Sequence, residues 1–168
     1  HKLLIISDVA VIPLPDFKQK MVQIGYLART ANLLGIATPK IACIAPSEQL
    51  LPNVISSTEG AQLAKMADRG QLGNVVVDGP LSLDVALYKE VAEHKKVKGS
   101  SVAGDPDCLL FPNLESANVF FKSVSHLCGG ELAAMVMGTK VPCVLTSRGD
   151  TSKTKLFSIA LACLAVKK

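Results

Sequence analysis

The chain has few aromatic and few charged residues for its length. Of its 168 residues, 4% are aromatic, none is tryptophan and 19% are charged, whereas 49% are hydrophobic. So low a charge content argues against disorder, because disordered chains are polar and highly charged. The net charge of +4 is scattered, and aromatic platforms for bases are nearly absent, which argues against a nucleic-acid-binding surface. We therefore predict a compact domain with a large buried core.

Several other sequence features are missing. No apolar run approaches the ~18 residues that a membrane span requires, and no signal peptide is visible. The chain begins at His1 rather than Met, which suggests a fragment. No CxxC pair occurs among the cysteines, which lie mostly inside apolar runs: Cys43, Cys108, Cys128, Cys143 and Cys163. We interpret them as buried, reduced thiols of a cytoplasmic protein without membrane attachment.

Short β-branched runs alternate with longer amphipathic stretches along the whole chain. The runs predict strands at 3–7, 40–45, 74–77, 108–111, 131–137 and 143–146. The amphipathic stretches predict helices over 16–34, 57–70, 82–93, 114–127 and 152–166. Because several strands are apolar on consecutive residues, we expect a sheet covered on both faces. The predicted fold class is α/β: a three-layer, doubly wound, mostly parallel sheet, with an irregular loop over 45–57.

Polar residues at the ends of predicted strands indicate where a ligand could bind, since open α/β sheets bind ligands at the carboxyl ends of their strands. Asp78 follows one strand, Asn113 another and Ser147 a third, so we expect these three around one cleft. An Asp-Gly-Pro turn explains Asp78 equally well. Asp105 precedes a strand instead, so we place it at the opposite edge of the sheet.

The stretch VLTSRGDT, residues 144–151, places a hydroxyl, a guanidinium and a carboxylate between a predicted strand and a predicted helix. A helix N-terminus attracts anions and arginine binds phosphate through two N–H groups, so Ser147, Arg148 and Asp150 predict an anion site. A polar turn is the alternative. An adhesion loop of the RGD type conflicts with the composition, and a hydrolase triad of Ser147 with His126 lacks the G-x-S-x-G elbow.

Asn118 and Lys122 are spaced i, i+4 on the helix predicted at 114–127, so both project from one helix face. They could hold a polar ligand group or simply form a solvated face. No metal site is predicted, because His94 and His126 are isolated from other metal-ligating residues.

Four blocks of the sequence resemble the phosphate acetyl/butyryl transferase family, and the similarity runs in order from about residue 3 to 166. These blocks are KMADRGQ (65–71), VVVDGPLSLDVAL (75–87), GDPDCLLFPNLESANVFFK (104–122) and VPCVLTSRGDTSKTKL (141–156). The ending with Thr-Ser-Arg and an acid resembles the phosphate butyryltransferase branch. This resemblance implies transfer of a short acyl group, such as butyryl, acetyl or a branched chain, between coenzyme A and inorganic phosphate, giving an acyl phosphate. Coenzyme A is then a substrate, and no permanent cofactor or metal is implied.

The resemblance also implies an architecture. Members of this family fold as two α/β domains with a fold like that of isocitrate and isopropylmalate dehydrogenases, and they form homodimers. Residues 1–168 resemble the C-terminal half, as one α/β domain, and the N-terminal domain has no counterpart in this chain.

Site residues follow from the matched positions. Ser147 and Arg148 match the pair that binds phosphate and stabilises the oxyanion or the leaving thiolate. An aspartate base lies further along in acetyl-type members, and here Asp150 is the nearest carboxylate. Asn118 and Lys122 match a Gly-Asn-x-x-Tyr-Lys pattern in which alanine and phenylalanine replace the glycine and the tyrosine. The sequence therefore predicts Ser147, Arg148 and Asp150 as catalytic residues and Asp78, Asn113, Asn118 and Lys122 as substrate-binding residues.

Two alternatives stay open. The chain could be a dimerising or coenzyme A-binding module that catalyses nothing alone, given its length and the lost glycine and tyrosine. A dehydrogenase-like relative is the third candidate, although no GxGxxG motif is present.

Overall fold

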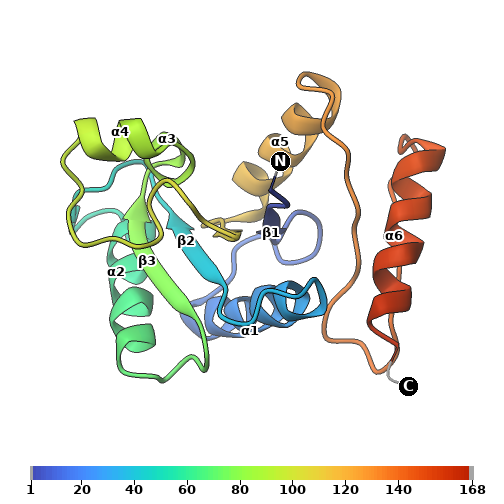
Figure 1. Cartoon of the computed structure of the whole chain (residues 1–168), viewed down its shortest axis with the longest axis horizontal. Coiled ribbons are helices and arrows are strands. Elements are labelled where there is room, and N and C mark those ends of the chain that lie inside the picture. Colours follow the sequence, from blue (N-terminus) through green and yellow to red (C-terminus); the bar gives the residue numbers. More distant parts are fainter. Residues whose placement is uncertain (1, 167–168) are drawn as a thin grey trace. The chain divides into compact units, whose positions relative to one another are not determined.

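The structure is a computed structural model that describes residues 2–166. It divides into two compact units, His1–Asn118 and Val119–Lys168, and each is described by itself. Figure 1 shows the elements in sequence colours. Unit 1 contains β1 (Ile5–Ser7), α1 (Phe17–Leu33), β2 (Lys40–Ile44), α2 (Ile55–Asp68), β3 (Val76–Leu81), α3 (Leu83–Leu87), α4 (Lys89–His94) and β4 (Cys108–Leu110). Helix α5 (Leu114–His126) crosses the division between the units, and α6 (Ser152–Leu164) belongs to unit 2.

The four strands form one parallel sheet in the order β1-β4-β2-β3. Each neighbouring pair is parallel, so every strand must be joined to the next by a crossover. Helices supply these crossovers and flank the sheet, and the prediction of a doubly wound α/β fold is confirmed. None of the helices within residues 2–166 is both long and apolar enough to cross a bilayer.

The first helix begins and ends where its sequence signals indicate. The Asp16 carboxylate accepts from the Gln19 N–H at 2.8 Å, and the Gln19 side chain accepts from the Asp16 N–H at 2.9 Å. This reciprocal capping box satisfies two backbone donors at the helix start. Gly35 follows the helix at a φ of 88°, a conformation that glycine adopts without steric cost. The helix predicted at 82–93 is instead two short helices, because Tyr88 has an extended backbone.

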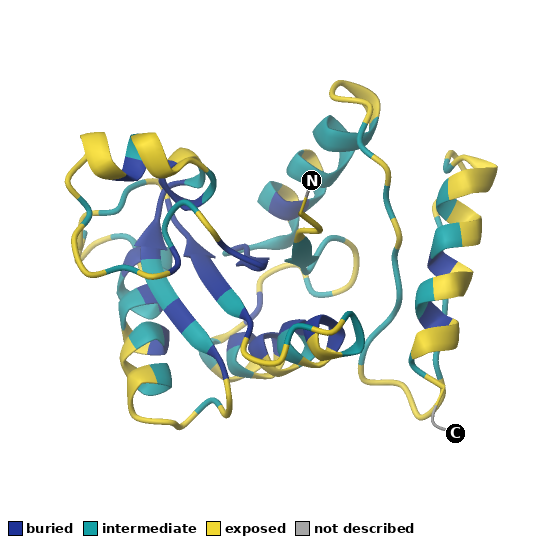
Figure 2. Cartoon of the chain, in the orientation of Figure 1, coloured by how far each residue is buried: buried dark blue, intermediate teal, exposed yellow. Residues whose placement is uncertain are grey.

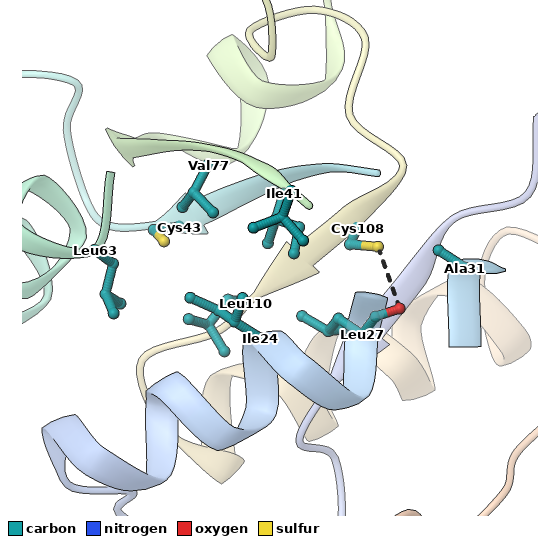
Figure 3. Close-up of a cluster of buried hydrophobic side chains, with 10 residues drawn as sticks. Ile24, Leu27, Ala31, Ile41, Cys43, Leu63, Val77, Cys108 and Leu110 are labelled. Carbon is teal, nitrogen blue, oxygen red and sulfur yellow. Dashed lines mark hydrogen bonds between the residues drawn. The ribbon is translucent and has the colours of Figure 1, made fainter. Parts of the chain in front are cut away.

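The core of unit 1 lies between the sheet and helices α1 and α2. Figure 3 shows that α1 and α2 direct apolar side chains onto alternate residues of the strands. The cluster consists of Ile24, Leu27, Ala31, Ile41, Cys43, Leu63, Val75, Val77, Cys108 and Leu110. At ~25 cal/mol per Å² of apolar surface, burying this face is the main favourable contribution to the stability of the unit.

The other face of the sheet is covered as well. Ala42 and Leu109, which alternate with the residues of the first face, have no exposed surface. Val85 and Ala86 of α3 are equally buried, and Figure 2 shows most of β2 in dark blue. This two-sided burial explains why the strands are apolar on consecutive residues, as the sequence analysis expected.

Two of the six predicted strands do not form. Residues 131–137 and 143–146 are joined by a single antiparallel bridge, in which the Val136 N–H donates to the Cys143 carbonyl at 2.8 Å. A strand requires a neighbour that pairs with successive backbone groups, and within residues 119–166 no sheet offers that edge. The apolar side chains of Val141 and Leu145 are 69% and 67% exposed. The apolar pattern was therefore insufficient to predict strands here.

The cysteine prediction is correct for two residues and wrong for three. Cys43 and Cys108 are buried in the sheet, and burial raises the pKa of each thiol to about 12. Cys128, Cys143 and Cys163 are exposed, because the apolar runs that contain them lie in unit 2, which buries few side chains.

The amino edge of the sheet carries a charge network, and Asp105 lies there as predicted. Its carboxylate accepts from Lys2 and from Lys40, each at 2.7 Å, while Asp107 accepts from the Lys40 N–H at 2.8 Å. Hydrogen bonds from Lys2 and then Lys40 lower the pKa of Asp105 to about 2. These contacts tie together the starts of β1, β2 and β4.

Candidate active site

The carboxyl ends of the parallel strands share one edge of unit 1, and Asn113 lies there. It follows β4 by three residues, as the sequence analysis predicted. Its side-chain oxygen accepts from the Ser116 N–H at 2.9 Å, which satisfies a free donor in the first turn of α5. Asn113 therefore fixes where α5 begins.

Asn118 is also held within unit 1. Its amide nitrogen donates to the Val9 carbonyl at 2.9 Å and so attaches α5 to the loop that follows β1. Asp8 orders the same loop, since its carboxylate accepts from the N–H groups of Ala10, Val11 and Ile12 at 2.8–3.1 Å. Asn118 thus holds a structural contact at the carboxyl edge, where the sequence analysis expected a substrate contact.

Asp78 lies inside β3 instead of following it. The strand continues through Gly79 and Pro80 to Leu81, so the expected Asp-Gly-Pro turn is wrong. Sheet pairing overrides the turn preference, because the Ala45 N–H donates to the Leu81 carbonyl at 2.9 Å. A Cβ at Gly79 would lie 2.6 Å from the Cβ of Cys43, so only glycine allows this close approach of β3 to β2.

A second polar cluster surrounds the start of α3. Ser82 stands at the N-cap position without a capping bond, and its hydroxyl donates to Glu48 at 3.3 Å. Lys95, from the end of α4, lies 3.0 Å from Asp84 and 3.6 Å from Glu48. Hydrogen bonds from Ser82 and then Lys95 lower the pKa of Asp84 to about 2. Lys95 therefore connects the end of α4 with the start of α3 and with Glu48 in the loop over 45–57.

Lys122 projects from the part of α5 that belongs to unit 2. Its ammonium lies 4.9 Å from the ring centroid of Phe121, a cation–π distance. Asn118 and Lys122 are on the same helix, as the spacing predicted, and the division between the units falls between them.

The stretch from Ser147 to Asp150 forms a closed turn in unit 2. The Asp150 carboxylate accepts from the Ser147 N–H at 2.7 Å, and the Asp150 N–H donates to the Ser147 carbonyl at 3.1 Å. Thr151 then caps α6 by accepting from the Thr154 N–H at 3.1 Å. The helix N-terminus is where the sequence predicted it, whereas the preceding strand is absent. Ser147 and Arg148 are exposed, so a hydroxyl and a guanidinium face solvent beside a helix N-terminus.

A cavity of about 260 Å³ adjoins this turn within unit 2. Asp150 and Thr151 line it on one side, and His126 and Glu131 on another. Lys153 also lines it and forms an ion pair with Glu131. The cavity therefore reaches the turn at Gly149 and Asp150.

An ion pair that the sequence analysis missed lies in unit 1. The Lys20 ammonium of α1 is 2.5 Å from the Glu59 carboxylate of α2. Both residues occupy positions that continue apolar stripes, Lys20 between Phe17 and Ile24, and Glu59 one turn before Leu63. In the sequence, this ion pair could have been recognised from a charged residue that occupies a position of an otherwise apolar stripe.

Within residues 2–166, no group of three or more His, Cys, Asp and Glu side chains could hold a metal ion.

A sequence model described as phosphate acetyl/butaryl transferase matches residues 1–163. The chain is 43% identical to a phosphate butyryltransferase of Clostridium acetobutylicum over 97% of its own length and 54% of that protein. It is 41% identical to a phosphate acetyltransferase of Thermotoga maritima over 95% of its length and 54% of that protein.

The fold is similar to that of solved proteins. A branched-chain phosphotransacylase from Enterococcus faecalis superposes with a TM-score of 0.87 at 30% identity, covering 95% of this chain and 56% of that one. The chain thus spans about half the length of the relatives that it matches.

Proposed function

Because the chain belongs to the phosphate acetyl/butaryl transferase family, we propose that its protein transfers a short acyl group between coenzyme A and inorganic phosphate. A phosphate oxygen attacks the thioester carbonyl, the C–S bond breaks, and the products are an acyl phosphate and the coenzyme A thiolate, which takes up a proton. Direct transfer requires two bound substrates and no covalent enzyme intermediate.

The closed turn from Ser147 to Asp150 is the observation that carries this proposal. Arg148 presents an exposed guanidinium, whose paired N–H groups suit a phosphate dianion. Ser147 presents a hydroxyl that can donate to the oxyanion or to the departing thiolate. Their neighbour α6 adds the positive end of its dipole.

Asp150 serves this turn in two ways in the proposal. Its carboxylate fixes the Ser147 backbone at 2.7 Å, and it is the nearest carboxylate available as a base for the thiol in the reverse direction. The adjoining cavity would admit part of a substrate beside it.

In the proposal, the predicted substrate-binding residues contact a substrate. Asn113 and Asn118 lie beside the carboxyl edge of the sheet, Asp78 lies within β3, and Lys122 extends the same helix as Asn118. Asn113 and Asn118 use one amide atom each in internal bonds. The other amide atom of each residue is the one that we assign to substrate.

We also propose the wider setting of the reaction. The chain corresponds to the C-terminal half of a two-domain protein that works as a homodimer in the cytoplasm, with coenzyme A as a substrate. Its partial coverage of its relatives and the exposed apolar side chains of unit 2 support a further domain. The five free cysteines suit a reducing compartment. The same partial coverage favours the second candidate function, a binding module inactive by itself.

The decisive experiment follows phosphate-dependent thiol release from butyryl-coenzyme A, using the protein that carries this chain. Arg148→Ala should lower kcat/KM by on the order of 10², because it removes a charge-assisted contact to a dianion. Lys140→Ala, which removes another exposed cation of unit 2, is the matched control and should leave the rate unchanged. Near-wild-type activity of a folded Arg148→Ala variant would contradict the assignment.

A further inference from the structure

His126, the last residue of α5, lines the cavity that reaches the turn from Ser147 to Asp150. This cavity has a volume of about 260 Å³, and all the residues that line it belong to unit 2. Asp150 and Thr151 line it just before α6, and His126 lines it at the end of α5. The sequence analysis treated His126 as isolated, whereas the fold brings it to the same cavity as the turn.

The chain folds back tightly after His126, which fixes the end of α5. The Gly130 N–H donates to the Val124 carbonyl at 2.9 Å, and a Cβ at Gly130 would lie 2.5 Å from Cγ1 of Val124. Only glycine therefore fits this close return, and Gly129 before it has a φ of 66°, which glycine adopts without steric cost. Gly129, Gly130 and Gly149 all line the cavity, so these parts of its wall carry no side chain that would fill it.

Both carboxylates that line the cavity already have partners. The Asp150 carboxylate accepts from the Ser147 N–H at 2.7 Å, and the Glu131 carboxylate pairs with the Lys153 ammonium. The imidazole of His126, in contrast, forms no hydrogen bond or ion pair with another described residue. A general base must be free to approach the proton that it accepts. Among the described side chains of the cavity, the imidazole meets this requirement best.

The proposed reaction needs a group that exchanges a proton with coenzyme A. When coenzyme A reacts with an acyl phosphate, its S–H bond breaks and sulfur bonds to the carbonyl carbon. The bond from that carbon to the phosphate oxygen then breaks, so a proton passes overall from the thiol to the departing phosphate. In the opposite direction, the proton passes from phosphate to the departing thiolate. Histidine suits both transfers, because both of its protonation states are generally accessible near neutral pH.

We propose that His126 is the general base and acid of this reaction, which takes the proton from the coenzyme A thiol and returns a proton to the thiolate in the opposite direction. The inference rests on the proposed function and moves this proton transfer from Asp150 to His126. Asp150 keeps its other role, which is to fix the Ser147 backbone. The shared cavity provides the path, because a base can reach its proton directly or through one water molecule.

The test measures consumption of the coenzyme A thiol with butyryl phosphate, using the protein that carries this chain. His126→Gln should lower kcat at pH 7 on the order of 10², with little change in the KM for butyryl phosphate. The loss should shrink toward pH 9, because an ordinary thiol ionises by itself near about pH 8.5 and then needs no base. His94→Gln is the matched control, since His94 is also an exposed histidine at the last position of a helix, and it should keep the wild-type kcat.

The charged groups around His126 do not obscure this comparison. They are Lys122, one turn earlier on α5, and the cavity residues Glu131, Asp150 and Lys153. His126→Gln leaves all four unchanged, so a pH dependence that differs between this variant and the wild-type protein comes from the imidazole. A loss in kcat that is equal at pH 7 and pH 9 would overturn the proposal.

Chemical rescue separates proton transfer from a structural role. His126→Ala removes the imidazole from an exposed position beside the cavity, so added imidazole can take its place. The added imidazole should raise the kcat of this variant about tenfold and leave His94→Ala unchanged. A deficient His126→Ala variant that imidazole does not rescue would show that His126 only shapes the cavity, and the proposal would fail.

Asp150→Asn compares the two candidate bases. Asparagine keeps a side-chain oxygen that can accept from the Ser147 N–H, so the turn can be retained. The proposal requires any loss of kcat in Asp150→Asn to be the same at pH 7 and pH 9. A loss at pH 7 that disappears near pH 9 would instead identify Asp150 as the base and overturn the assignment to His126.

The wild-type protein separates failure of this inference from failure of the proposed function. If it catalyses acyl transfer in neither direction, the proposed function fails and the inference fails with it. If it is active and His126→Gln is equally active at pH 7, only the inference fails.

Discussion

The two units of the chain bury their apolar side chains very differently. Among the described residues, the buried apolar core of unit 1 has only one counterpart in unit 2, Ala162. Unit 2 instead exposes more than half of each of these side chains: Val119, Leu127, Val141, Leu145, Leu156, Ile159, Leu164 and Val166. In α6 the buried positions belong to Ser158 and Ala162, whereas Leu156, Ile159 and Leu164 are exposed.

This difference shows that the two units obtain their structure by different means. Unit 1 closes a sheet between layers of helices and completes its own core. Unit 2 is held by polar contacts, such as the Ser158 hydroxyl, which accepts from the Ala134 N–H at 3.0 Å and donates to the Thr154 carbonyl at 2.7 Å. We expect stability to depend on unit 1, while the proposed chemistry depends on an exposed turn in unit 2.

Matched leucine truncations should give the largest difference between the units. Leu109→Ala removes a side chain with no exposed surface from β4 and should lower the free energy of unfolding by about 2–5 kcal/mol. Leu156→Ala removes a side chain that is 62% exposed in α6 and should change it by less than about 0.5 kcal/mol. Urea denaturation followed by circular dichroism measures both, and equal losses would abolish the distinction between the units.

Ser147→Ala should affect activity without affecting stability. If its hydroxyl stabilises charge that develops in the transition state, kcat should fall on the order of 10² while KM changes little. The unfolding transition should stay where it is, because Ser147 is exposed. Ser125→Ala, in the same unit, is the control. A change confined to KM would mean that Ser147 only binds substrate.

Gly79→Ala should show how closely the strands of unit 1 approach each other. The added Cβ would lie 2.6 Å from the Cβ of Cys43, so β3 must shift, at a cost of about 1–3 kcal/mol. Gly149→Ala adds a methyl group in the unit 2 turn, where nothing lies within 4 Å, and is the matched control. The midpoints of thermal unfolding compare the two variants. Similar midpoints would show that β3 and β2 move apart at Gly79 with little loss of stability.

The smallest expected effect concerns acid stability at the amino edge of unit 1. Lys2 and Lys40 lower the pKa of Asp105 to about 2, below its unfolded value near 3.9. This stabilisation is therefore present above about pH 4 and is lost as the pH falls toward 2. Since Asp105 is 59% exposed, it amounts to less than about 1 kcal/mol.

Asp105→Asn should accordingly lower stability at pH 7 and make it less dependent on pH between 4 and 2. Asp68→Asn, which removes an exposed carboxylate from α2, is the comparison. Parallel pH profiles for the two variants would show that the network at the amino edge contributes nothing.

The sequence predicted well the elements that are indicated by their own residues, through helix-end signals or runs of consecutive apolar residues. Helix α1 was expected at 16–34 and occupies Phe17–Leu33, since a capping box and a terminal glycine define its ends. The four strands of unit 1 were all expected, because consecutive apolar residues indicate burial on both faces. Asn113 was correctly placed after β4 for the same reason.

Elements that depend on distant partners were predicted less well. The strands expected at 131–137 and 143–146 have the right composition, yet β structure needs a paired edge that composition cannot supply. Asp78 was expected just after a strand, and the pairing of β3 with β2 keeps it inside one.

The sequence by itself determined the α/β alternation, the family, and the succession of hydroxyl, guanidinium and carboxylate before α6, because these depend on residues close together in the chain. Only the tertiary structure decided that Lys20 meets Glu59 and that Asn118 holds the loop after β1. Those pairs are separated by 39 and 109 positions, and no periodicity links them. Buried polar contacts of this kind depend on which strands and helices become neighbours, which is settled by packing over the whole unit.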